Sequence, residues 1–299
     1  MKKVIGIDVG GTMVKGALID ATGEIAHQDC FPTNDKDSSP EWMETAREMH
    51  RLLKERSGCE NCLTGIAAPG IANSEHTAIA FMPGRLAGIE NFHWGEYLGG
   101  GEVFVLNDAH AALMAESSFG AGKGLMNIVL LTLGTGVGGG ILINGKLYTG
   151  QGLMAGHLGH ITVNSAVDET GITGSPGTLE QAIGNTTVGR RSSGRFDSTS
   201  RLVEAYDKGD SFAAYVWLDS VRKLALAICS ISNAISPDAV ILGGGITNAG
   251  ESLFRPLSEF LDVYEWRPGG KKTQILQAQY SELSGAVGAA AFALARSRK

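Results

Sequence analysis

The chain has 299 residues, of which 43% are hydrophobic and 19% charged, a composition typical of soluble globular proteins. This length favours two lobes over one compact core. The formal net charge of −6 argues against a nucleic-acid partner, because nucleic-acid-binding surfaces gather basic residues. The densest basic stretch, with Arg190, Arg191 and Arg195, is rich in Ser and Gly and is expected to be a solvated loop.

The sequence predicts neither a signal peptide nor a membrane span. Asp8 and the glycines after it interrupt the apolar stretch at the N-terminus. Residues 124–145 carry no charge, but glycines crowd their middle, so two buried strands around a glycine loop fit better than a membrane helix. The four cysteines include one isolated C-x-x-C at Cys59 and Cys62, and they favour a reducing cytoplasm over a disulfide framework.

Hydrophobic runs and turn residues predict the elements of the first half in chain order. Strands are expected at 4–8, 14–19, 24–30, 63–68 and 103–106, and helices at 41–56 and 109–119. A glycine-rich linker follows at 120–124.

The pattern then begins again with a second glycine-turned hairpin. Strands are expected at 128–133, 140–143, 146–148 and 239–242, and helices at 178–183, 211–235, 251–261 and 284–295. Because both halves open in the same way, we expect an α/β fold with a duplicated domain and a ligand cleft between two lobes. The first lobe would comprise residues 1–119, completed by 284–299, and the second would comprise 120–283.

The first glycine turn is a candidate phosphate loop. Gly10 and Gly11 allow backbone N–H groups to approach a phosphate, and Thr12 adds a hydroxyl donor. Lys15 adds positive charge, and Asp8, at the end of the first strand, could hold Mg²⁺ through water. Taken alone, a β-hairpin with a polar turn is the simpler interpretation.

Two further glycine turns strengthen the nucleotide interpretation. They comprise Gly134, Thr135 and Gly136 between apolar strands, and Gly243, Gly244 and Gly245 after the strand at 239–242. The third turn suits a ribose or a flat ring lying on bare backbone. Neither a Walker loop nor a dinucleotide fingerprint fits. The ordered set of three predicts a nucleotide held between the lobes.

This order resembles the ROK family (repressors, open reading frames, kinases) of the actin-like ATPase and sugar kinase superfamily, which has a two-lobed, ribonuclease H-like fold. The resemblance covers nearly the whole length and is carried by residues 6–12, 106–109, 133–140, 156–160, 179–180, 242–246 and 285–290. It implies a cytoplasmic sugar kinase that uses ATP and Mg²⁺ and forms a homo-oligomer, commonly a dimer. The DNA-binding domain of ROK repressors is not expected, since the first strand begins at Val4.

Asp108 is the candidate catalytic base. It follows a buried strand and opens a helix, where a carboxylate can accept the proton of a sugar hydroxyl during phosphoryl transfer. Asn107 could donate and accept hydrogen bonds toward neighbouring sugar hydroxyls. From the residues alone, Asn107 and Asp108 could equally be a helix cap. The family resemblance implies the catalytic role for Asp108.

The resemblance also implies a sugar site, with departures. His160 and Glu180 match family sugar ligands, and Gly70 matches a sugar-side turn. His157 stands where the family has a glutamate, and Phe81 where it often has an asparagine. The two histidines, three residues apart, could also be polar loop or metal residues. The identity of the sugar is therefore open.

A structural zinc, often held in the family by His160's counterpart and three cysteines, is not expected. The cysteine positions are occupied by Gly171, Thr173 and Thr178, and none of these offers a thiolate.

The function expected is phosphorylation of a hexose, with glucose as the first candidate, at its 6-hydroxyl by ATP. Alternatives are another acceptor, such as an N-acetylhexosamine or fructose, and polyphosphate as the donor. An alternative of another class is a non-catalytic sugar sensor, which the retained Asp108 and both phosphate loops argue against.

Overall fold

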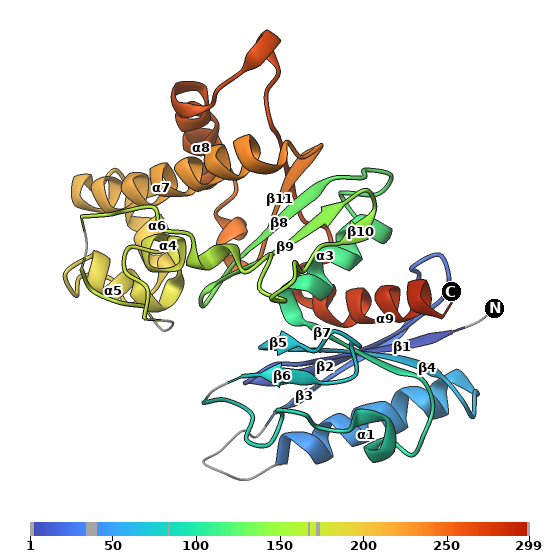
Figure 1. The fold of residues 1–299 in the computed structure, drawn as a ribbon. Helices are drawn as coiled ribbons and strands as arrows, with labels where there is room; N and C mark the ends of the chain where they lie inside the picture. The colour runs from blue at the N-terminus through green and yellow to red at the C-terminus, as the bar shows by residue number, and fades with distance from the viewer. Residues whose placement is uncertain (1–2, 34–40, 83, 167, 172–173, 298–299) are drawn as a thin grey trace. The chain divides into compact units, whose positions relative to one another are not determined.

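The computed structural model describes residues 3–33, 41–82, 84–166, 168–171 and 174–297. The chain forms two compact units (Figure 1). Unit 1 comprises Met1–Gly124, Leu147–Ala155 and Gln279–Lys299, and unit 2 comprises Leu125–Lys146 and Gly156–Ala278.

This division differs from the sequence-based one, which assigned residues 120–124, 147–155 and 279–283 to the second lobe. Gln279 and Tyr280 pack with unit 1 because their backbone N–H groups both donate to Oε1 of Glu116 at 2.8 Å. The Glu116 side chain is fully buried, so these bonds satisfy a carboxylate that would otherwise be costly there.

Unit 1 is built on one five-stranded sheet with the strand order β3-β2-β1-β4-β7. Its strands are β1 (Val4–Val9), β2 (Met13–Ile19), β3 (Ile25–Pro32), β4 (Leu63–Ala68) and β7 (Val103–Asn107), and a separate pair is formed by β5 (Ile71–Ala72) and β6 (Ile79–Phe81). Its helices are α1 (Glu41–Ser57), α2 (Trp94–Tyr97), α3 (Asp108–Ser118), the 3₁₀ turn Ser281–Leu283 and α9 (Ser284–Arg296).

Helices cover both faces of this sheet. Helix α1 packs on β1, β2 and β3, and the alanine-rich α9 packs on β1 and β4 and against α3 (Figure 1). On the α1 side, Trp42 is fully buried with its indole N–H donating to the carbonyl of Ala87 at 3.0 Å. Trp42 lies 5.6 Å from the Trp94 ring, a contact worth about 0.5–1.5 kcal/mol beyond its buried area.

Unit 2 repeats the plan with a sheet of order β10-β9-β8-β11-β12. Its strands are β8 (Ile128–Leu133), β9 (Val137–Ile143), β10 (Lys146–Leu147), β11 (Ala239–Gly243) and β12 (Gln274–Gln277). Its helices are α4 (Leu179–Ile183), α5 (Val188–Arg191), α6 (Thr199–Asp207), α7 (Ser211–Ile235) and α8 (Glu251–Tyr264). Its 3₁₀ turns are η1 (Leu158–His160), η2 (Asn185–Thr187), η3 (Gly245–Ala249) and η4 (Pro268–Gly270).

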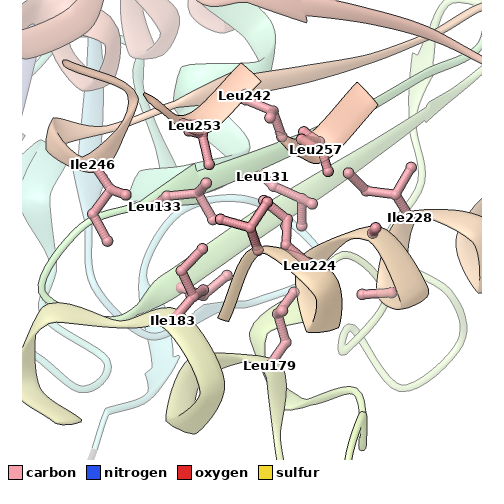
Figure 2. Packing of buried hydrophobic residues seen from close by; sticks show 14 of the residues in the cluster. Leu131, Leu133, Leu179, Ile183, Leu224, Ile228, Leu242, Ile246, Leu253 and Leu257 are labelled. Atoms are coloured by element: carbon pink, nitrogen blue, oxygen red, sulfur yellow. The ribbon is translucent and has the colours of Figure 1, made fainter. Parts of the chain in front are cut away.

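The core of unit 2 lies between its sheet and the helices α4, α7 and α8. Figure 2 shows Leu131 and Leu242 from the strands meeting Leu224 of α7 and Leu253 of α8. All four are buried, and each contributes about 1.5–3 kcal/mol through removal of its side chain from water.

The two sheets have the same topology. In each, the first strand pairs antiparallel with the second, and two later strands join in parallel: β4 and β7 in unit 1, β11 and β12 in unit 2. The duplicated α/β architecture expected from the sequence is therefore confirmed. The expected cleft between the lobes stays a prediction. Within the part of the chain that the structure describes, no helix is long and apolar enough to cross a bilayer.

The stretch with Arg190, Arg191 and Arg195 is not a solvated loop, contrary to the sequence-based expectation. It contains α5 and leads into α6. Arg191 donates to the carbonyls of Ile183 and Gly184 at 3.2 and 3.0 Å. Burial, and next the charge of Arg190, lower the pKa of Arg191 to about 10. Arg191 also donates to the hydroxyls of Thr187 and Ser220. The polar composition concealed these bonds, because carbonyls and hydroxyls occur in loops and folded elements alike.

Candidate active site

In unit 1, the candidate catalytic and metal residues lie at the carboxyl ends of parallel strands. Asp8 of β1 is in register with Ala67 of β4, and Asn107 at the end of β7 is in register with Ala68. Asp8, Asn107 and Asp108 therefore converge on one edge of the sheet, where open α/β sheets commonly bind ligands.

Asn107 is the N-cap of α3. Its Oδ1 accepts from the N–H groups of Ala109 and His110 at 2.9 and 3.2 Å, and its Nδ2 donates to the carbonyl of Gly70 at 2.9 Å. The helix-cap interpretation thus describes Asn107 and not Asp108. One amide hydrogen of Asn107 is not used by these three bonds.

Asp108 is the first residue of α3, and it is exposed. Its Oδ1 accepts from the N–H of Ala109 at 2.8 Å. Close packing of protein atoms around Asp8, and next the negative charge of Asp108, raise the pKa of Asp8 to about 7. The charge of Lys15 opposes this shift.

Lys15 is tied down at the same edge. Its Nζ donates to the carbonyl of Glu282 at 3.2 Å and lies 3.6 Å from that residue's carboxylate. The sequence did not suggest this partner, which arrives from a segment 267 residues away.

The first glycine turn closes the β1–β2 hairpin. The N–H of Gly10 donates to the carbonyl of Met13 at 3.0 Å, and the carbonyl of Gly10 accepts from the hydroxyl of Thr33 at 2.6 Å. Gly11 and Thr12 are exposed at the tip of the turn. Their backbone and the Thr12 hydroxyl are therefore the parts of this turn that a phosphate can reach.

In unit 2, the second glycine turn is held by the segment that follows α4. The carbonyl of Gly134 accepts from the N–H of Asn185 at 2.9 Å, and the carbonyl of Thr135 accepts from the N–H and hydroxyl of Thr186, each at 3.1 Å. The N–H of Gly134 donates to the carbonyl of Gly136 at 2.9 Å. With its carbonyls held from outside, the loop keeps a defined shape.

The third glycine turn meets the second. Gly243 of β11 is in register with Thr132 of β8, which places both turns at the carboxyl edge of the sheet. Gly244 has φ +86°, and a Cβ there would come within 2.4 Å of the carbonyl oxygen of Leu133. Only glycine satisfies both conditions.

A cavity of about 510 Å³ opens between these two turns. This volume suits a nucleoside-sized ligand. The lining residues include Gly134, Thr135 and Gly245 from the two turns, with Asn185, Ser198, Thr199, Ser200, Val203, Glu204, Asp207, Ile246, Asn248 and Ala249. Sequence reasoning missed the contribution of α6. Its only sequence signal is Ser198, a typical N-cap residue, whose hydroxyl accepts from the N–H of Arg201.

The segment with the two histidines adjoins α4, which carries Glu180, elsewhere in unit 2. His157 and His160 flank and end η1, and both are partly exposed. The residue after His160 accepts at its carbonyl from the N–H of Leu179 at 2.8 Å. His160 precedes Ile161 and Glu180 follows Leu179, so the two residues flank this backbone hydrogen bond on adjoining segments.

Glu180 also contacts the second glycine turn. Its Oε2 accepts from the N–H of Val137 at 3.0 Å. No motif in the sequence indicated this bond.

Of the three positions where the family often has zinc-binding cysteines, the structure describes Gly171 and Thr178. Thr178 is the N-cap of α4 and forms a capping box with Gln181. Thr173 lies outside the described residues. Among those described, no group of three His, Cys, Asp or Glu side chains is placed to hold a metal ion. Phe81 has 57% of its surface exposed.

Comparison with known proteins identifies one family and several sugar kinases as relatives. The ROK family model matches residues 4–296. A glucokinase from Halalkalibacterium halodurans is 32% identical over 290 residues, covering 87% of this chain and 85% of that protein. An N-acetyl-D-glucosamine kinase from Histophilus somni is 30% identical over 309 residues, covering 97% and 99%.

Solved structures of ROK proteins are similar to this chain over nearly its whole length. The ROK hexokinase from Thermus thermophilus is similar with a TM-score of 0.86 and 27% identity, over 99% of both chains. A ROK family glucokinase from Streptomyces griseus, in complex with glucose and AMPPNP, has a TM-score of 0.79 and 27% identity, over 98% of this chain and 99% of that one. The expected actin-like, ribonuclease H-like fold is confirmed.

Proposed function

The chain belongs to the ROK family, and we propose that it is an ATP-dependent kinase that phosphorylates a hexose at the 6-hydroxyl, with glucose as the first candidate. The observation that carries the proposal is Asp108: an exposed carboxylate at the first turn of α3, beside Asp8, at the carboxyl edge of a parallel sheet. The relatives that are glucokinases, and the neighbour crystallised with glucose and AMPPNP, support this choice of substrates.

In the proposed reaction, Asp108 accepts the proton of the sugar 6-hydroxyl. The O6 atom forms a bond to the γ-phosphorus of ATP, and the bond from that phosphorus to the β–γ bridging oxygen breaks. The products are the hexose 6-phosphate and ADP. Because the chemistry needs little covalent help from the protein, correct placement of O6 and acceptance of its proton supply most of the catalysis.

A divalent cation fits the pair Asp8 and Asp108. The two carboxylates lie close enough for the charge of Asp108 to raise the pKa of Asp8, a repulsion that a cation would relieve. Proteins commonly hold Mg²⁺ with one or two carboxylates, waters and substrate phosphates. When bound, Mg²⁺ would neutralise charge on the phosphates, with Asp8 holding it through water.

We assign the nucleotide to the glycine turns and the cavity beside them. Gly11, Thr12, Gly134, Thr135 and Gly136 would contact the phosphates, and Gly10 and Lys15 would support the first turn. The adenosine would occupy the cavity of about 510 Å³, with Gly243, Gly244 and Gly245 beneath it.

We assign the sugar to Gly70, Asn107, His157, His160 and Glu180. The unused amide hydrogen of Asn107 can donate to a sugar hydroxyl without disturbing the cap of α3. His160 and Glu180, on adjoining segments, would bind further hydroxyls, and His157 would occupy the place of the usual glutamate.

A kinase assay over a sugar panel tests the proposal. Purified protein with ATP and Mg²⁺ should release ADP with glucose, and phosphorus NMR should show the phosphate on O6. The analogue 6-deoxyglucose should bind without turnover, because it lacks the accepting hydroxyl. Sugar binding with no stimulated ADP release would identify a sensor and contradict the proposal.

The same assay separates the alternative substrates. N-acetylglucosamine is the second candidate acceptor, since a kinase for it is 30% identical to this chain. Fructose and N-acetylmannosamine complete the acceptor panel, and polyphosphate should be tested as donor. A cytoplasmic homodimer remains an expectation from the family, and light scattering of the purified protein would measure its mass.

A further inference from the structure

The second phosphate loop and the candidate sugar segment meet at one side chain, Glu180. Glu180 is the second residue of α4, and its Oε2 accepts from the N–H of Val137, the residue that follows Gly136. A single hydrogen bond of 3.0 Å within unit 2 therefore joins a candidate sugar ligand to the loop assigned to the phosphates.

The space around this bond is tight on the loop side. A Cβ placed on Gly136 would come within 2.2 Å of Oε2, and the three atoms nearest to it would all belong to the Glu180 side chain. Gly136 does not have a positive φ, so its backbone conformation is open to other residues. A side chain at position 136 would therefore displace the carboxylate of Glu180.

The other side of the carboxylate is open. In the part of the chain that is described, Oε1 of Glu180 forms no hydrogen bond, and the side chain is partly exposed. A carboxylate can accept at both oxygens at once. Glu180 can therefore bind a hydroxyl at Oε1 while it holds Val137 at Oε2.

We propose that Glu180 is a positioning residue that couples sugar binding to the shape of the second phosphate loop. This inference rests on the proposed kinase function and adds a coupling between its two substrates. A sugar hydroxyl at Oε1 orients the carboxylate, and Oε2 fixes the N–H of Val137 and hence the loop. Such coupling is reciprocal, so ATP must also strengthen sugar binding by the same factor.

The direction of the change in nucleotide affinity when Glu180 is replaced distinguishes this role from a purely electrostatic one. A carboxylate beside a phosphate-binding loop repels the nucleotide, so without a positioning role its removal would tighten nucleotide binding. Loss of the hydrogen bond to Val137 should instead weaken it. A net hydrogen bond is worth about 0.5–1.5 kcal/mol, which corresponds to about a 2- to 12-fold change in Kd.

The first experiment measures AMPPNP binding by calorimetry with no sugar present. Glu180→Ala should raise the Kd for AMPPNP by about 2- to 12-fold. Glu180→Gln should bind AMPPNP at least as tightly as the wild type, because its amide oxygen still accepts from the N–H of Val137 and the repelling charge is gone. An unchanged or tighter Kd in Glu180→Ala overturns the proposal.

The second experiment measures glucose binding with no nucleotide present. Gly136→Ala should displace the Glu180 side chain and weaken glucose binding by at least about 2-fold, the lower limit for a lost hydrogen bond. Gly189→Ala, in α5 and outside the assigned site, is the matched control for sugar affinity, because a Cβ there would come no closer than 3.7 Å to another residue, the carbonyl oxygen of Phe196. In the Glu180→Ala background, Gly136→Ala should have little additional effect, which a double-mutant cycle measures. Equal glucose affinity in Gly136→Ala and the wild type would disprove the coupling.

Failure of the kinase proposal would be distinct. A wild-type protein that phosphorylates no hexose contradicts the proposed function, whereas the AMPPNP series tests the role of Glu180 in the loop without any sugar.

Discussion

Replacement of Asp108 by asparagine should remove the proton acceptor while leaving the site in place. The amide has the shape of the carboxylate, and its oxygen can still accept from the N–H of Ala109, as Oδ1 of Asp108 does at 2.8 Å. The cap of α3 is Asn107, so the helix keeps its N-terminal bonds. We expect the free energy of unfolding to change by less than about 1 kcal/mol, the usual limit for a charge at a helix N-terminus.

The catalytic effect should be much larger. General-base catalysis contributes about 10²- to 10⁴-fold, or about 3–5 kcal/mol of barrier, so kcat of Asp108→Asn should fall by that factor. Glucose Kd should stay within tenfold, because the oxygen that orients O6 remains. Coupled ADP-release kinetics and calorimetry measure the two quantities.

A matched control and a second readout make the test specific. Glu251→Gln removes the same charge from the first turn of α8, at an exposed position, and should leave kcat unchanged. The pKa of Asp8, about 7 in the wild type, should fall in Asp108→Asn because the negative charge that adds to the effect of burial is gone. A carboxyl titration by NMR measures this shift. If Asp108→Asn retains kcat within tenfold of the wild type, Asp108 is not the base and the mechanism is refuted.

Three further predictions concern single residues, and a fourth concerns the positions of the family's zinc ligands. His157→Glu should change the ranking of kcat/KM among glucose, its epimers and 2-substituted analogues, with little effect on the KM for ATP, since a carboxylate accepts hydrogen bonds that imidazole cannot; an unchanged ranking would place His157 outside the pocket. Thr199→Val should weaken ATP binding by about 2- to 12-fold in calorimetry, because the buried Thr199 hydroxyl lines the cavity proposed for the nucleotide and has no hydrogen-bond partner among the described residues. Equal affinity would assign that hydroxyl to another role. Burial, and next the charge of Lys54, lower the pKa of His50 to about 4 in the folded protein. As the pH falls from 6.5 to 4, the unfolded chain therefore binds the proton first, and the free energy of unfolding falls by up to about 3 kcal/mol. Urea unfolding should show a smaller loss over that range in His50→Gln. Elemental analysis should find no stoichiometric zinc, and a chelator should leave Tm unchanged once Mg²⁺ is restored; one zinc per chain would contradict the interpretation of Gly171, Thr173 and Thr178.

The long elements could be predicted from the sequence because their signals are local. The helix at 211–235 and the strands at 63–68 and 128–133 have the predicted bounds, since each is a long or strongly apolar segment bounded by turn residues. The short helices α2 and α5, the helix α6 and the edge strand β12 were missed. These elements are short or polar, and their stability comes from tertiary packing more than from their own sequence.

The candidate site shows the same division. Glycine turns between apolar strands, and Asn107-Asp108 after a strand, are local patterns, so the sequence by itself determined the α/β plan and the candidate phosphate and catalytic residues. Only the tertiary structure decided that Asn107 and not Asp108 caps α3, that α6 lines the cavity beside the second and third glycine turns, and that Glu180 reaches the N–H of Val137. Each of these depends on backbone groups brought together from distant parts of the chain. Every residue except proline carries the same backbone N–H and carbonyl, so no pattern of side chains predicts which of these groups will form a hydrogen bond.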